Sequence, residues 1–243
     1  MGARARQLDV RLSTHPGQYT VLNSERDDVV RAAAAELEVQ AALFDAMGLG
    51  PEAVVVVHVG GVAGGLDAGL ERFERGFELL SESARARVAV ENDDRSYPIA
   101  PVVGLARRLD VPAVFDPHHH RCLDPDGIGD REAVEMAVAT WADRAVPKIH
   151  FSSPRLDVGE RQKKVGRKVV RSPALPELRN HADLVDPMAF ELFGLQALAG
   201  RRVDVMLEAK AKDLALLRLR QQLVARGHEW SQGRLRFARS SAD

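Results

Sequence analysis

The chain has 243 residues, of which 45% are hydrophobic and 28% are charged, and its formal net charge is −1. This composition is typical of a globular protein with a sizeable core, and it provides no global positive charge that would attract nucleic acid. The single cysteine, Cys122, excludes an intrachain disulfide framework and a zinc site built from cysteines alone. The first fifteen residues lack the apolar core of a signal peptide, and no run approaches the ~18 apolar residues that a membrane span needs. We therefore expect no membrane contact and a location in a reducing cytoplasm.

Short apolar runs alternate with helical patterns along the chain. The predicted strands are 8–15, 53–61, 88–92, 113–116, 148–153 and 204–209. The predicted helices are 24–47 with Ser24 as N-cap, 68–85, 99–109, 130–142 and a last one ending near 225. The segment 181–187 is ambiguous. Alternation at this spacing indicates parallel strands joined by right-handed crossovers, in an α/β fold.

Glycine motifs do not identify a nucleotide-binding fold. No glycine fingerprint follows the first predicted strand, although an open doubly wound sheet stays possible. The glycine-rich segment 60–65 follows a strand, but it lacks the Lys-Ser/Thr of a phosphate-binding loop. We interpret it as a βα loop.

Nearly every predicted strand has a metal-type ligand at its carboxyl end. These residues are His15, His58, Glu91, Asp116 followed by His118–His120, His150 and Glu208, with His181 in the connection before the last strand. One such histidine is usually an ordinary polar group. In parallel α/β folds, however, the carboxyl ends of the strands meet on one face, where sites are built.

Several carboxylates sharing one face would repel one another, and divalent cations remove that penalty. A mixed nitrogen and oxygen set without thiolates suits Mn²⁺, Zn²⁺ or Fe²⁺ better than Ca²⁺. The number of ligands exceeds what one ion needs, so we expect two or three ions. Sites of this kind hold the attacking and leaving oxygens of a phosphodiester.

Two further groups of residues have open interpretations. Lys148 shares a strand face with His150 and is expected either to contact phosphate or to pair with Glu91 or Glu208. The basic segment 155–171 is either a solvated surface insertion or a phosphate-contacting loop.

The order of seven motifs resembles the ultraviolet damage endonuclease family. They are HPGQYTVLNS (15–24), HVGG (58–61), ENDDR (91–95), FDPHHH (115–120), KIHFSSPR (148–155), HADLVDP (181–187) and DVMLEAK (204–210). The resemblance covers residues 8–212 and implies a metal-bearing TIM (β/α)₈-type barrel. Endonuclease IV and xylose-isomerase-like barrels are the wider relatives.

The resemblance implies an enzyme that nicks double-stranded DNA on the 5′ side of photoproducts and other distorting lesions, in DNA excision repair. The metal ions, with Mn²⁺ favoured over Zn²⁺, Mg²⁺ or Co²⁺, would activate water without a covalent enzyme intermediate. The positions that match the family's metal ligands are His15, His58, Glu91, Asp116, His119, His150, His181 and Glu208. The expected catalytic residues are Glu91, Asp116, His150, Glu208 and Lys148. Lesion and DNA contacts are expected from Gln18, Tyr19, Arg155, Lys163 and Lys164.

The first predicted strand, which carries His15, matches the third strand of the family barrel. We therefore expect an incomplete barrel of about six βα units, in which the first two strands are missing. The expected organisation is one catalytic domain over 1–226 and a peripheral tail over 227–243, in a bacterial cytoplasmic monomer that associates with the nucleoid. The alternatives are a sugar isomerase or epimerase on the same barrel, and an inactive DNA-binding remnant.

Overall fold

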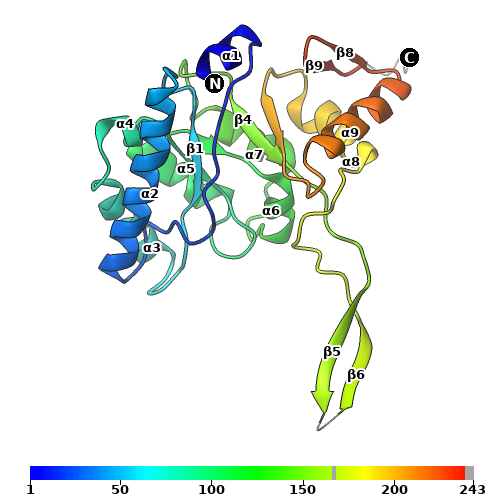
Figure 1. Cartoon of the computed structure of the whole chain (residues 1–243), viewed down its shortest axis with the longest axis horizontal. Coiled ribbons are helices and arrows are strands. Elements are labelled where there is room, and N and C mark those ends of the chain that lie inside the picture. Colours follow the sequence, from blue (N-terminus) through cyan, green and yellow to red (C-terminus); the bar gives the residue numbers. More distant parts are fainter. Residues whose placement is uncertain (166–167, 239–243) are drawn as a thin grey trace. The chain divides into compact units, whose positions relative to one another are not determined.

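The computed structural model describes residues 1–165 and 168–238, which form two compact units (Figure 1). Unit 1 comprises 1–149 and 201–205, and unit 2 comprises 150–200 and the described residues from 206 onward. The prediction of one domain over 1–226 with a tail over 227–243 stays a prediction, and residues 239–243 of that tail lie outside the described residues.

The core of unit 1 is a parallel sheet. Strands β1 (Val55–His58), β2 (Val88–Glu91) and β3 (Ala113–Val114) pair in that order. Single parallel bridges extend this sheet, from Thr14 to Val55 on one side and from Phe115 to Ile149 on the other. The strands are buried on both faces because they consist mainly of valine and alanine, as expected for a parallel sheet covered by helices.

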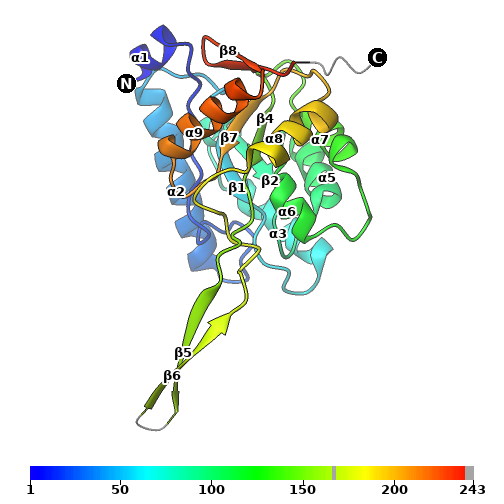
Figure 2. The ribbon, with the colours of Figure 1, turned by 90° about the vertical axis from the view of Figure 1, so that its right-hand side faces the viewer.

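Helices of unit 1 lie against this sheet (Figures 1 and 2). Helix α2 (Asp27–Ala46) packs against β1, and α5 (Ile99–Leu109) packs against β2 and β3. The remaining helices of unit 1 are α1 (Gly2–Gln7), α3 (Leu66–Phe77), α4 (Glu82–Arg85), α6 (Pro117–Cys122) and α7 (Asp130–Val138).

The described residues of unit 2 form two helices, a π-helical turn and two hairpins. The helices are α8 (Pro187–Phe193), followed by the turn η1 (Gly194–Leu198), and α9 (Asp213–Ala225). The hairpins are β5 (Gly159–Val165) with β6 (Lys168–Ala174), and β8 (Glu229–Ser231) with β9 (Arg234–Arg236). Strands β4 (Lys148–Phe151) and β7 (Asp204–Leu207) pair with each other, and each has residues in both units.

Several predicted boundaries are wrong. The strand predicted over 8–15 reduces to the bridge at Thr14, because α1 occupies 2–7 and Asp9 has a φ of +52°, outside the extended region. Helix α2 begins at Asp27 rather than after Ser24, because the Ser24 hydroxyl accepts from the Arg26 amide at 3.2 Å in a local turn.

The helix predicted over 68–85 is two helices. It breaks before Ser81, whose hydroxyl caps α4 by accepting from the Ala84 amide at 3.2 Å. The helix predicted to end at 142 ends at Val138. The five strands predicted downstream of residue 50 are present, each shorter than predicted.

No helix in the described part of the chain has the length and the apolar character that a membrane span needs.

Candidate metal centre

The carboxyl ends of β1 and β2 place His58 and Glu91 side by side. The two residues are register partners at the last position of their strands. The Glu91 carboxylate is completely buried, and three imidazoles surround it. Its oxygens lie 3.0 Å from His15 Nε2, 3.7 Å from His58 Nε2 and 3.7 Å from His119 Nδ1. The sheet of unit 1 therefore brings four of the predicted ligands together.

Asp116 joins this cluster from the end of β3, where it is also the N-cap of α6. Its Oδ1 accepts from the amides of His118 at 2.6 Å and His119 at 2.9 Å. Its Oδ2 is buried and has no hydrogen-bond partner in the described part of the chain. The cap fixes the carboxylate and leaves one oxygen available to a cation.

Asn92 orients two of these residues and was not among the predicted site residues. Its buried side chain accepts from the Asp116 amide at 2.9 Å and donates to the Asp116 carbonyl at 3.0 Å. Its own carbonyl lies 3.0 Å from His119 Nδ1. An Nδ1–H donated to that carbonyl leaves His119 Nε2 with its lone pair, which is how proteins prepare a histidine ligand. The available signal was its position directly after Glu91.

Burial lowers the pKa of His58, and the nearby His15 and His119 add to this effect, while the Glu91 carboxylate opposes it. A neutral imidazole is the form that binds metals. Of the neighbouring histidines, His120 has a separate contact, with Nε2 2.7 Å from the Ile128 carbonyl.

Lys148 lies in unit 1, where its amine contacts a hydroxyl instead of forming the ion pair with a carboxylate that was one of its two interpretations. Its amine contacts the hydroxyl of Ser13, while Arg11 forms the ion pair with Asp204 at 2.8 Å. Burial and the nearby Arg11 charge lower the pKa of Lys148, Asp204 opposes them, and the net result is a pKa of about 8. Ser13 and the buried Lys148 thus form a polar pair; Ser13 precedes His15 by two residues, and Lys148 shares β4 with His150.

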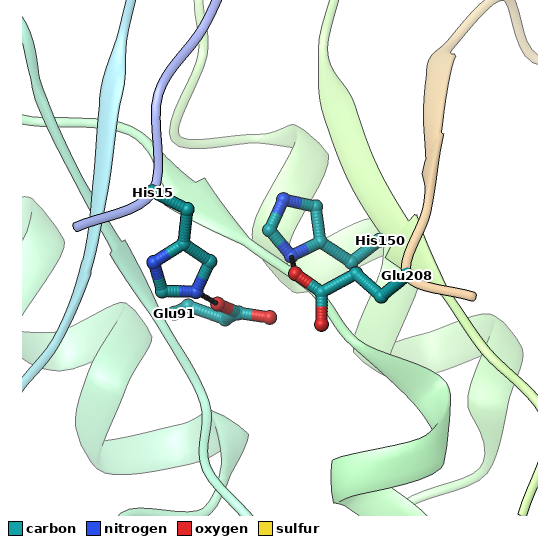
Figure 3. A group of neighbouring side chains, drawn as sticks. All are labelled: His15, Glu91, His150 and Glu208. Carbon is teal, nitrogen blue, oxygen red and sulfur yellow. Dashed lines mark ion pairs between the residues drawn. The ribbon is translucent and has the colours of Figure 1, made fainter. Parts of the chain in front are cut away.

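Unit 2 contains a second group of the predicted ligands. His150 Nδ1 lies 3.1 Å from one oxygen of Glu208, and His181 Nδ1 lies 3.4 Å from the other. The backbone positions them: the Glu208 amide donates to the Phe151 carbonyl at 3.0 Å, and His181 forms a bridge with Pro154. Figure 3 shows the His15–Glu91 and His150–Glu208 pairs, each joined by its ion pair.

The predicted lesion contacts lie in the loop after His15. Gln18 and Tyr19 are both exposed, and Tyr19 retains 83% of its accessible surface. The Thr20 amide donates to the Gly17 carbonyl at 3.0 Å, which closes the turn beneath them. Gln18 and His58 line one small cavity of ≈ 20 Å³. The turn thus presents both side chains to solvent near the cluster of unit 1.

The predicted DNA contacts in unit 2 lie on or beside the β5–β6 hairpin. Arg155 is 3.4 Å from Asp157, and Lys164 is exposed on β5. Lys163 belongs to β5, but its side chain lies outside the described residues, as does Arg167 of the basic segment.

The sequence matches the family UV-endonuclease UvdE over residues 1–235. The chain belongs to this family. UV DNA damage endonuclease of Bacillus pumilus is 34% identical over 228 residues, which are 93% of this chain and 65% of the relative. The protein of the same name from Bacillus velezensis is 30% identical and equally covered. The chain thus spans slightly under two thirds of the length of these curated relatives.

Solved structures confirm an α/β TIM-like fold. The structure of SacUVDE matches with a TM-score of 0.76 at 30% identity, covering 93% of this chain and 69% of the other. D-psicose 3-epimerase from Clostridium cellulolyticum matches with a TM-score of 0.52 at 13% identity, covering 91% and 75%. The second likeness concerns the fold alone.

Proposed function

We propose that this UvdE-family chain is a metal-dependent DNA repair endonuclease that nicks the backbone on the 5′ side of ultraviolet photoproducts and other distorting lesions. The observation that carries the proposal is the buried Glu91 carboxylate surrounded by three imidazoles, with Asp116 capping the adjacent helix. The relatives named UV DNA damage endonuclease support the choice of substrate.

The residues of unit 1 fit a divalent ion. A buried Asp116 oxygen and a buried His58 nitrogen have no hydrogen-bond partner among the described residues. Such groups cost free energy unless a cation or water completes them. The donor set of imidazoles and carboxylates suits Mn²⁺, which we favour over Zn²⁺, Mg²⁺ or Co²⁺. A bound divalent ion supplies Lewis acidity and lowers the pKa of water.

The protein's own groups would hold and orient the substrate. His15, His58, Glu91, Asp116 and His119 are the proposed ligands in unit 1, and His150, His181 and Glu208 are those in unit 2. Asn92 keeps Asp116 and His119 in place. Lys148, with its lowered pKa, is proposed to face the phosphate. Gln18 and Tyr19 are proposed to probe the lesion, where a poorly stacked step is less costly to open.

Four finer points are also part of the proposal. They are a centre of two or three ions, a barrel of about six βα units that lacks the first two, a monomeric state and a cytoplasmic location beside the nucleoid. Metal content per chain and sedimentation of the purified protein test the first and third.

Nicking of ultraviolet-irradiated supercoiled plasmid with Mn²⁺ tests the proposed function. We expect nicking that requires both irradiation and metal. Glu91→Gln, which removes the charge at the centre of the cluster, should reduce the rate by at least about 100-fold. Glu71→Gln is the matched control, because Glu71 is an exposed residue of α3.

Nicking by Glu91→Gln at the unaltered rate, or nicking of irradiated plasmid without divalent metal, would contradict the proposal. Metal-dependent epimerisation of a ketose without plasmid nicking would favour the epimerase alternative. Binding of irradiated DNA without nicking would favour the inactive remnant.

A further inference from the structure

The connection between β4 and α8 contains an unusually basic segment. Residues 155–179, hereafter the arm, hold eight Lys and Arg against three Asp and Glu. The arm therefore carries a formal charge of +5 in a chain whose net charge is −1. This concentration makes the arm a candidate for contacts to a polyanion.

The arm is a regular two-stranded ribbon rather than a loop. Strands β5 and β6 pair antiparallel in register from Gly159 with Ala174 to Val165 with Lys168. In Figures 1 and 2 the ribbon extends away from α8 and α9. A seven-residue strand spans about 23 Å, and the major groove of B-DNA admits a two-stranded ribbon of this kind.

Both faces of the ribbon present exposed basic side chains that could contact phosphates. Register partners point to the same face, so Lys164 and Arg171 share one face and Lys168 lies on the other. All three side chains are exposed. Lys164 and Lys168 have no ion pair within the described part of the chain, whereas Arg171 lies 3.5 Å from the exposed Glu160.

The arm also exposes apolar side chains, which a purely solvated insertion would not need. They are Leu156, Val158, Val169, Val170, Leu175 and Leu178, each with at least half of its surface accessible. Val169 and Val170 lie on opposite faces of the ribbon, beside the basic residues. Basic and small apolar groups together suit a DNA groove, where phosphates line the edges and sugars and thymine methyls lie between them.

The base of the arm is fixed beside two of the proposed ligands. The Arg155 amide donates to the Asn180 carbonyl and the Ala182 amide donates to the Ser153 carbonyl, both at 2.8 Å. Between these bonds lies the bridge from Pro154 to His181, and His181 contacts Glu208. A duplex held by the arm is therefore aligned with respect to His181.

We propose that the arm is a lesion-independent anchor that lies in the major groove of the undamaged duplex beside a lesion. Lys164, Lys168 and Arg171 contact phosphates. The inference rests on the proposed function for the choice of DNA, and it assigns to the arm a task separate from recognition of damage. The eleven residues from Arg155 to the end of β5 would reach at most about 36 Å if all were extended, or roughly ten base pairs.

The first experiment measures the affinity for an undamaged duplex and for the same duplex with one thymine dimer, in EDTA and over a range of salt. The test variant is K164Q/K168Q/R171Q. The control is R31Q/R75Q/R107Q, which removes the same charge from exposed positions on the helices of unit 1. We expect the affinity of the test variant for both duplexes to be at least about tenfold lower. The slope of the logarithm of its binding constant against the logarithm of the salt concentration should be smaller in magnitude by about 2 to 3.

In the same measurements, the ratio of the two affinities should not change, and the control should bind as the unaltered protein does. Unchanged binding by the test variant overturns the proposal. A fall in the ratio also overturns it, because the arm would then read the lesion. A change of oligomeric state with unaltered DNA binding would assign the arm to protein contacts and overturn it as well.

The second experiment shortens the duplex stepwise on each side of the dimer. We expect the affinity to fall when one particular flank becomes shorter than about ten base pairs. Replacing 159–174 by a short Gly-Ser turn should abolish that dependence, and retention of it would contradict the proposal. Both experiments measure binding, so absence of plasmid nicking would refute the proposed function without affecting this result.

Discussion

At the scale of single residues, Asp116 combines two tasks that can be separated. One carboxylate oxygen caps α6 and the other is left for a cation. An asparagine keeps a cap acceptor and loses the charge, whereas an alanine loses both.

We therefore expect Asp116→Asn to weaken Mn²⁺ binding by at least about tenfold while the metal-free protein keeps its stability within about 1 kcal/mol. Asp116→Ala should weaken binding equally and cost about 1 kcal/mol more in the free energy of unfolding. Calorimetric titration and urea denaturation in EDTA measure the two effects. Equal stability of the two variants would show that the cap contributes nothing.

Arg87 is a second residue whose effect can be predicted, here on stability. Its buried guanidinium donates to the Leu49 carbonyl at 2.7 Å and to Asp45 at 2.5 Å, just beyond the carboxyl end of α2. A positive charge there also favours the helix dipole. We expect Arg87→Met to lower the free energy of unfolding by about 2–4 kcal/mol, measured by urea denaturation.

Asp45 should make part of that stability depend on pH. Hydrogen bonds from Ser83 and Arg87 lower the pKa of Asp45. The contribution of Asp45 to the free energy of unfolding is therefore complete at neutral pH, and it is lost as the pH falls through the lowered pKa of this carboxyl group. Asp45→Asn should show less acid destabilisation than the unaltered protein.

At the scale of elements, two loops of unit 1 are joined by a buried hydrogen-bond network. Asn23 donates to the Gly61 carbonyl at 2.7 Å and accepts from the Gly61 amide at 3.1 Å. The Tyr97 hydroxyl donates to the same carbonyl at 2.9 Å. The network holds the segment that follows Gln18 and Tyr19 against the loop that follows His58.

Gly60 is required where these loops meet. Its φ is +112°, and a Cβ there would lie 2.3 Å from Asn23 Oδ1. We expect Gly60→Ala to cost about 2 kcal/mol or more in stability, from backbone strain and loss of the network. Gly61→Ala is the adjacent control, because a Cβ there meets nothing within 4 Å and should change stability little. A similar thermal midpoint for the two variants would contradict this interpretation.

At the scale of the whole molecule, metal binding should stabilise the folded chain. A ligand that binds only the folded state adds about 2.7 kcal/mol when its concentration is one hundred times its Kd. We expect Mn²⁺ to raise the thermal midpoint of EDTA-treated protein, and Glu91→Gln in unit 1 to reduce that rise. Because the family resemblance assigns ligands in both units, Glu208→Gln should reduce it as well. A rise that survives both substitutions would contradict the assigned ligands.

The sequence alone determined the class of fold and the identity of the metal-type residues. Valine-rich strands that alternate with helices indicate a parallel sheet, because a strand that is buried on both faces must be apolar along its whole length. The ordered motifs then indicated the family. Boundaries were less well determined: Asp9, Ser24 and Ser81 ended or delayed elements through local backbone and side-chain bonds that no periodicity reveals.

Only the tertiary structure decided how the polar groups are used. Asn92 positions Asp116 through hydrogen bonds that the sequence did not predict. Lys148 contacts Ser13 instead of a carboxylate, and the basic segment forms a two-stranded ribbon. These outcomes depend on contacts between residues far apart in the chain. A sequence pattern specifies which face a residue lies on, whereas the hydrogen-bond partner depends on what the fold brings to that face.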